Sequence, residues 1–90
     1  MLMAFHTYVL QNPQNRLYVG STGDLTERLE RHAAGDSRWT SKRGPWRLVY
    51  SEEHASRSAA MRREKYLKSG SGREWLRLEL NDRAGPPQAD

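Results

Sequence analysis

The chain has 90 residues, which suits one domain with a modest core. It has no cysteine, so disulfides and thiolate metal sites are excluded, and a reducing compartment fits. It contains no apolar run long enough to cross a membrane, and MLMAFHTYVL at the start lacks the features of a signal peptide. We therefore expect a cytoplasmic protein without a membrane partner.

Positive charge is concentrated in two segments. The formal net charge is +4, from 15 Lys and Arg against 11 Asp and Glu. Residues 36–47 contain four cations and one carboxylate, and residues 57–68 contain five cations and one carboxylate. Clustered positive charge favours a phosphate-rich partner. Basic side chains that only keep a helix face soluble would explain the charge equally well.

A β-hairpin is predicted near the N-terminus. FHTYVLQ at 5–11 and RLYVG at 16–20 are rich in β-branched and aromatic residues, and NPQN between them is a turn signal. Side chains alternate across a strand, so Leu17 and Val19 should share one face and Tyr18 should point to the other.

A helix is predicted over residues 25–34. Asp24 is placed to cap it, with Glu27 as the second member of a capping box, and Gly35 to end it. The four-residue spacing of Leu25, Leu29 and Ala33 predicts the buried stripe of this helix. Arg28 and His32 would then share a face beside that stripe.

The second half of the chain predicts a basic loop, a strand and two helices. The loop spans 36–45, and the strand over 46–54 alternates Trp46, Leu48 and Tyr50 with more polar positions. A helix follows over 56–68, in which Ala60, Glu64 and Leu67 would share a face, so that a carboxylate lies beside the apolar stripe. A capping box from Ser71 to Glu74 would begin the third helix, packed down by Trp75, Leu76 and Leu78 to Leu80.

The predicted order is therefore β-β-α-β-α-α. This indicates an α+β fold with a small three-stranded sheet, mixed or antiparallel, flanked by helices. We expect one domain over residues 1–81 and a flexible tail over 82–90, because RAGPPQAD is rich in Pro and Gly.

Several common kinds of site are excluded by their spacing. Gly20 and Gly23 do not continue into a phosphate-binding loop, and no serine stands in a nucleophile elbow. The three histidines lack the spacing of zinc ligands.

A scattered set of polar residues remains: Tyr8, Tyr18, Arg28, His32 and Glu64. Each has an ordinary structural explanation. A strand tyrosine can keep its hydroxyl exposed to solvent. Arg28 can form an ion pair with Asp24, and Glu64 can form one with Arg57 or Lys68. Together they are what phosphodiester hydrolysis needs. Arginine binds a phosphate that gains charge, a carboxylate holds a hard divalent cation, and a tyrosine or histidine can accept a proton from water.

The sequence resembles the GIY-YIG nuclease family. YVG at 18–20 matches the second half of the family signature, and His6-Thr7-Tyr8 stands where the first half has Gly-Ile-Tyr. Arg28, His32 and Glu64 fall where the family has its essential arginine, a histidine one turn later and its metal-binding glutamate. Residues 45–76 also look like the small single-domain bacterial branch, related to the nuclease module of the nucleotide-excision repair endonuclease. The resemblance covers roughly residues 5–80.

The resemblance implies a GIY-YIG-like fold and a metal-dependent DNA endonuclease that uses Mg²⁺ or Mn²⁺. Tyr8 or Tyr18 would activate water, Arg28 would stabilise the phosphate charge, Glu64 would hold the metal and His32 would support the tyrosine or the leaving side. DNA is the expected partner, with branched and damaged DNA among the candidate substrates and repair or recombination as the expected setting.

The loop offers further expected contacts to DNA. Arg38, Thr40, Lys42 and Arg43 would bind the backbone, and Trp39 would either stack on an unpaired base or fold back onto the core.

Two other functions are compatible with the sequence. The chain could be a nucleic-acid-binding module that is not catalytic or depends on a partner, although such a module has no need for Glu64 beside an apolar face. It could also be a structural interaction protein whose charge is incidental. A weak salt dependence of DNA binding would favour the last of these.

Overall fold

Three strands and three helices make up the part of the chain that the computed structural model describes, residues 4–34 and 44–84. In chain order they are β1 (Phe5–Gln11), β2 (Leu17–Thr22), α1 (Leu25–Ala33), β3 (Arg47–His54), α2 (Arg57–Lys68) and α3 (Gly70–Ala84). The predicted order and the α+β class are confirmed. The division into a domain over 1–81 and a tail over 82–90 stays a prediction, and α3 ends at Ala84.

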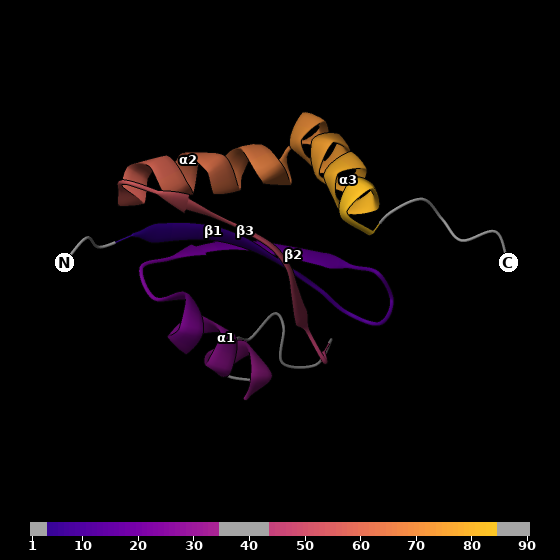
Figure 1. The fold of residues 1–90 in the computed structure, drawn as a ribbon, viewed down its shortest axis with the longest axis horizontal. Helices are drawn as coiled ribbons and strands as arrows, with labels where there is room; N and C mark the ends of the chain where they lie inside the picture. The colour runs from indigo at the N-terminus through magenta and orange to yellow at the C-terminus, as the bar shows by residue number, and fades with distance from the viewer. Residues whose placement is uncertain (1–3, 35–43, 85–90) are drawn as a thin grey trace, which may run out of the picture.

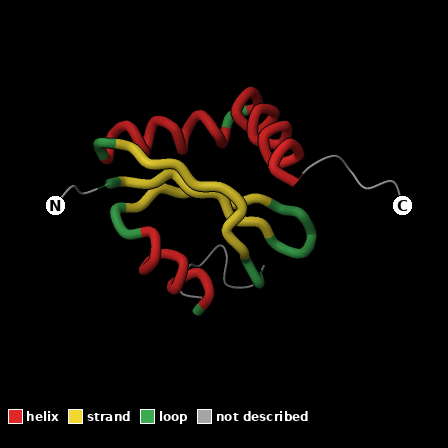
Figure 2. The backbone as a smooth tube through the Cα atoms, in the orientation of Figure 1, coloured by secondary structure: helices red, strands yellow, loops and turns green. Residues whose placement is uncertain are grey.

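The sheet has the order β2-β1-β3, and both pairings are antiparallel. Helices α2 and α3 cover one face of the sheet and α1 lies on the other (Figures 1 and 2). Strand β1 is therefore central, and β2 and β3 each leave one edge unpaired within the described sheet. No helix in the described ranges is long and apolar enough to cross a membrane.

Asn12 organises the turn of the β1–β2 hairpin. Its side-chain oxygen accepts hydrogen bonds from the backbone N–H groups of Gln14 at 3.0 Å and Arg16 at 2.8 Å. Asn15 adopts a left-handed backbone with φ of 63°, which asparagine tolerates better than most residues. Strand β2 then runs two residues beyond the predicted end at Gly20, because pairing with β1 continues through Ser21 and Thr22.

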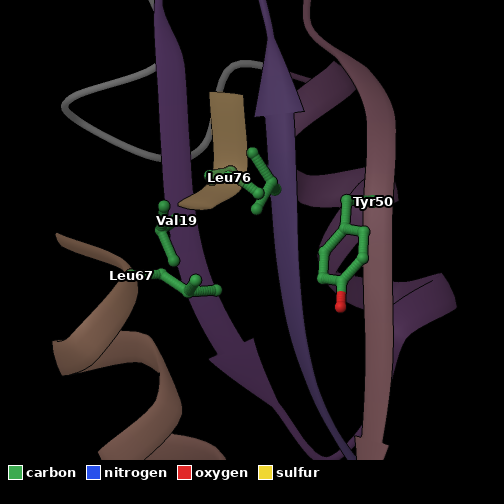
Figure 3. Packing of buried hydrophobic residues seen from close by; sticks show 5 residues of the cluster. Val19, Tyr50, Leu67 and Leu76 are labelled. Atoms are coloured by element: carbon green, nitrogen blue, oxygen red, sulfur yellow. The ribbon is translucent and has the colours of Figure 1, made fainter. Parts of the chain in front are cut away.

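The core lies between the sheet and the helix pair α2–α3. Val9, Val19 and Tyr50 come from the three strands and pack against Leu67 of α2 and Leu76 of α3 (Figure 3). Leu17 packs against this cluster on the same face as Val19, as predicted. The alternation of side chains leaves the other face of β1 and β2 for Tyr8, Leu10 and Tyr18.

The predicted alternation of β3 is wrong, because a bulge interrupts it. Val9 pairs with Tyr50 and the next residue, Leu10, pairs with Leu48, so Val49 is the extra residue of the bulge. Tyr50 is therefore buried and Val49 packs against the core, whereas Leu48 is 41% exposed. The strand begins at Arg47, one residue later than predicted.

The predicted capping box of α3 is also wrong. The helix begins at Gly70, and Ser69 rather than Ser71 caps it, since the Ser69 hydroxyl accepts a hydrogen bond from the N–H of Gly72 at 3.2 Å. A Cβ at Gly72 would lie 1.9 Å from the carbonyl oxygen of Tyr66. Gly72 thus permits the close approach of α3 to the end of α2. Of the residues expected to pack α3 down, Leu78 is exposed.

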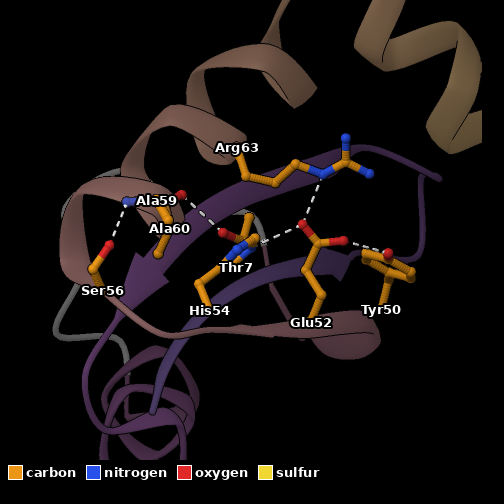
Figure 4. A network of polar contacts seen from close by, with 8 residues as sticks. All are labelled: Thr7, Tyr50, Glu52, His54, Ser56, Ala59, Ala60 and Arg63. Atoms are coloured by element: carbon orange, nitrogen blue, oxygen red, sulfur yellow. Dashed lines mark hydrogen bonds and ion pairs between the residues drawn. The ribbon is translucent and has the colours of Figure 1, made fainter. Parts of the chain in front are cut away.

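A carboxylate network joins β3 to α2 (Figure 4). Glu52 accepts hydrogen bonds from the Tyr50 hydroxyl at 2.5 Å and from Nε of Arg63 at 2.7 Å. Burial raises the pKa of Glu52, but these hydrogen bonds and the Arg63 charge outweigh it and hold the pKa below its usual value. The guanidinium carbon of Arg63 also lies over the Trp75 ring, 4.6 Å from the ring centroid.

A separate hydrogen bond holds the start of α2 against β1. The buried hydroxyl of Thr7 donates to the carbonyl oxygen of Ala60 at 2.8 Å. With the Glu52–Arg63 pair, this contact sets how α2 is rotated about its axis. Helix α2 begins at Arg57, after the cap Ser56, and as predicted it buries Ala60 and Leu67 with Glu64 beside them.

Truncation of Leu76 to alanine should lower the free energy of unfolding by about 2–5 kcal/mol, because Leu76 is fully buried in the core. The matched control is Leu78→Ala on the same helix, which should change it by less than about 0.5 kcal/mol because Leu78 is 56% exposed. Urea unfolding followed by circular dichroism measures both. Equal losses in the two variants would contradict the placement of α3.

Candidate active site

Helix α1 buries His32, while Leu25, Arg28 and Leu29 are half-buried. Asp24 caps the helix by accepting from the N–H of Glu27 at 3.0 Å, as predicted, but the Glu27 side chain pairs with Arg31 at 2.6 Å. Ala33, predicted to be buried, is exposed, and His32 is the buried residue of this helix at 5% exposure. Helix α1 ends at Ala33, and the predicted end at Gly35 lies outside the described residues.

Tyr8 and His32 meet at the centre of this face. The Tyr8 side chain is fully buried, and its hydroxyl lies 3.0 Å from Nε2 of His32. Gly20 is opposite Tyr8 in the β1–β2 pairing, and a Cβ at Gly20 would lie 2.6 Å from the Tyr8 hydroxyl oxygen. The phenol therefore crosses directly over the Gly20 backbone, which explains why a glycine stands in YVG.

Two further aromatic rings extend this pair, Tyr18 in contact with it and Trp46 in contact with Tyr18. The Tyr18 ring centroid is 5.0 Å from that of His32 and 6.3 Å from that of Tyr8. Tyr18 also makes an edge contact with Trp46, with the two ring centroids 6.3 Å apart. Tyr18 is partly exposed, unlike Tyr8, so it has a side available to solvent. Sequence reasoning did not assign Trp46 to the site, because its place just before β3 gives no sign of this contact.

Arg28 completes the group on this face. Burial raises the pKa of Tyr8, and the charge of Arg28 and a hydrogen bond from it offset part of that rise; burial lowers the pKa of His32, and the Arg28 charge adds to that lowering. The alternative pairing with Asp24 is not observed in the described residues. Its Nε is buried and has no hydrogen-bond partner there. Buried donors are normally satisfied, so a guanidinium with an unsatisfied Nε–H is suited to an anionic ligand.

Burial dominates the protonation of the two central groups. It raises the pKa of Tyr8 to about 12, with a further rise from Tyr18, and Arg28 offsets only part of this. The pKa of His32 is lowered, first by burial and then by the Arg28 charge. At neutral pH Tyr8 is thus a protonated phenol and His32 a neutral imidazole, and the tautomer of His32 sets which of the two donates the hydrogen bond.

Glu64 lies next to strand β2 and on its other face. Its carboxylate accepts from the Ser21 hydroxyl at 2.7 Å and pairs with the Lys68 ammonium at 2.7 Å. Of the two alternatives, Lys68 rather than Arg57 is therefore its partner. Ser21 is opposite Thr7 and points toward α2, whereas Tyr8 points toward α1. Glu64 is nevertheless close enough to raise the pKa of Tyr8.

The structure thus brings Tyr8, Tyr18, Arg28 and His32 together on one face, with Glu64 across the edge strand. In the described residues no three His, Asp or Glu side chains gather as a metal cluster. A single carboxylate still suits Mg²⁺ or Mn²⁺ chemically, because Mg²⁺ commonly keeps waters and takes substrate phosphates beside one or two carboxylates. Arg38, Trp39, Thr40, Lys42 and Arg43 lie outside the described residues.

Comparison with known proteins identifies the family. Residues 4–77 match the family model of the GIY-YIG catalytic domain, so the chain belongs to the GIY-YIG family, a family of nucleases.

Similar proteins include several UPF0213 proteins. The one from Staphylococcus haemolyticus is 38% identical over 78 residues, covering 84% of this chain and 95% of the relative. The one from Natronomonas pharaonis is 39% identical over 78 residues, covering 86% and 92%. The solution NMR structure of a UPF0213 protein from Bacillus halodurans matches with a TM-score of 0.55 and 34% identity, over 93% of this chain and 89% of that one.

Substitution of Gly20 by alanine should destabilise the protein by about 1–3 kcal/mol, since the new methyl group must displace a buried phenol from its histidine partner. Chemical denaturation measures the loss. Gly70→Ala is the control, because a Cβ there meets no atom within 4 Å. If both variants are equally stable, the phenol does not cross over Gly20.

Stability should fall in alkali because of Tyr8. An unfolded tyrosine releases its proton near pH 10, whereas Tyr8 in the folded protein keeps it to about 12. The unfolded state is therefore favoured as pH rises through this interval, by about 1 kcal/mol at pH 11 from Tyr8 alone.

Urea unfolding of the native protein and Tyr8→Phe at about pH 9 and 11 measures this difference. The Tyr8→Phe variant should lose the share of the pH dependence that Tyr8 contributes. Tyr66→Phe, which changes an exposed tyrosine of α2 and leaves Tyr8 intact, should retain that share. A native protein and a Tyr8→Phe variant with equal pH dependence would show that Tyr8 titrates like a free tyrosine.

Proposed function

We propose that this protein is a metal-dependent endonuclease that hydrolyses phosphodiester bonds in DNA. One observation carries the proposal: Nε of Arg28 is buried and unsatisfied within the described residues, next to Tyr8 and His32. The chain belongs to a family of nucleases. In such a protein, a guanidinium with a free donor is suited to bind a phosphate whose charge grows in the transition state. Branched or damaged DNA, in repair or recombination, is the substrate we propose.

The two tyrosines receive different roles. Tyr8 is fully buried and its pKa is raised, so it is a poor acceptor for a proton from water. Tyr18 is partly exposed on the same face, and we assign it the contact with the attacking water. Tyr8 and His32 are then positioning residues, because the hydrogen bond between them fixes the imidazole against which Tyr18 packs.

Glu64 is the proposed ligand of a divalent cation, Mg²⁺ or Mn²⁺. When bound, such an ion would polarise a phosphate oxygen and lower the pKa of a bound water. The Ser21 hydroxyl holds one carboxylate oxygen and Lys68 holds the other, so the side chain is already oriented. As a ligand, this carboxylate would lie across β2 from Arg28.

The same contacts favour a second candidate function. Both oxygens of Glu64 already have partners in the protein, which is also what a purely structural carboxylate would show. A nucleic-acid-binding module without its own catalysis, or dependent on a partner, would keep the fold and the basic surface but would not need Glu64 as a ligand.

Cleavage of a supercoiled plasmid and of a branched oligonucleotide, with Mg²⁺ or Mn²⁺ and with EDTA, decides between the two. Arg28→Ala should reduce the cleavage rate by about 10²–10³, because one phosphate-binding donor group is lost. Glu64→Ala should abolish the metal-dependent rate. Tyr18→Phe should reduce the rate by about 10²–10⁴ if its hydroxyl takes the proton.

The matched controls are Arg31→Ala and Glu30→Ala, two exposed residues of α1. Both should cut like the native protein. Circular dichroism and thermal unfolding check that every variant is folded. Equal activity of the native protein, Arg28→Ala and Glu64→Ala would mean that the cutting comes from a contaminant and would favour the binding module.

A further inference from the structure

A groove runs beside the candidate active site, between the edge strand β2 and helix α3. Its volume is about 940 Å³. Leucines from β2, α2 and α3 line its apolar part, namely Leu17, Leu67, Leu76 and Leu80. The turn of the hairpin contributes Asn15 and Arg16 at one end. The roles given above to Tyr8, His32 and Arg28 do not involve this groove.

The rim of the groove is positively charged. Its described lining includes four cationic side chains and no carboxylate: Arg16, Lys68, Arg73 and Arg77. Arg73 and Arg77 are one turn apart on α3, so they share a face. Arg77 pairs with Glu74 at 3.4 Å, but both side chains are more than half exposed, and such a pair is weak. The rim therefore concentrates positive charge around an apolar floor.

The groove is continuous with the candidate active site through two residues. Tyr18 lines the groove and also packs against His32. Lys68 lines the groove and also pairs with Glu64 at 2.7 Å. A polymer whose bond is held at Tyr18 and Glu64 would therefore meet this groove next.

We propose that the groove binds the backbone of the DNA strand adjacent to the bond that is cleaved. A nucleic-acid backbone alternates anionic phosphates with apolar deoxyribose carbons, which matches a cationic rim over a leucine floor. Arg73, Arg77 and Arg16 bind phosphates, and the leucines contact sugars. This inference rests on the proposed nuclease function, because the strand bound in the groove is the one that is cleaved at the candidate active site.

The test is DNA binding measured without metal, so that no cleavage occurs. Fluorescence anisotropy of a labelled oligonucleotide in EDTA, over a range of salt concentrations, compares the native protein with the double variant Arg73→Gln/Arg77→Gln. Each lost phosphate contact should reduce the slope of log affinity against log salt by about 1, so the double variant should lose about 2. Both arginines are exposed, so the variant should fold.

The matched control is Arg62→Gln/Lys65→Gln, which removes the same charge from exposed positions of α2 outside the groove. It should leave the salt slope close to the native value. Equal slope losses in the two double variants would overturn the proposal, since binding would then follow total charge alone.

Competition by polyglutamate identifies the occupant. Unlabelled DNA should displace the labelled oligonucleotide far better than polyglutamate at equal charge. If polyglutamate competes equally well, the groove takes an acidic peptide and the proposal fails. Because binding is measured in EDTA, a protein that binds through the groove but never cuts would refute only the nuclease function. A protein that cuts but binds independently of Arg73 and Arg77 would refute only the groove.

Discussion

The close passage of the Tyr8 phenol over Gly20 is the constraint on which the candidate site depends. No side chain at position 20 could share that space, because a Cβ would lie 2.6 Å from the Tyr8 hydroxyl oxygen. The passage allows the hydroxyl to reach Nε2 of His32, and this bond secures α1 to the sheet. It also removes Tyr8 from water, which raises its pKa and leaves the partly exposed Tyr18 as the ring that a substrate can meet.

On the other face of the sheet, a separate set of contacts positions the carboxylate of Glu64. The Glu52–Arg63 pair and the Thr7–Ala60 hydrogen bond fix the rotation of α2, and Glu64 then faces Ser21 on β2. The proposed chemistry therefore spans one edge strand, with the arginine and aromatic rings on one side and the carboxylate on the other. The basic groove lies along the same edge, which makes β2 the strand around which the proposed DNA path is organised.

Helix α1 illustrates how local patterns mislead at a functional site. The four-residue spacing of Leu25, Leu29 and Ala33 predicts an apolar stripe, yet Ala33 is exposed and His32 is buried. His32 points inward beside the half-buried Leu25 and Leu29 because Tyr8 and Tyr18 offer it partners, which a periodicity argument about apolar residues does not consider. The bulge in β3 is a similar case, because one extra residue reverses the face of the sheet to which the preceding residues of the strand point.

The sequence by itself determined the order of the elements, the cap at Asp24, the α+β class and the family, because strand and helix patterns and the YVG signature are local. It also named Tyr8, Tyr18, Arg28, His32 and Glu64. Only the tertiary structure decided that Tyr8 is buried, that Lys68 and Ser21 hold Glu64, and that Trp46 joins the aromatic group. The Tyr8–His32 contact joins residues 24 positions apart and the Ser21–Glu64 contact residues 43 apart, and burial depends on such contacts between distant segments.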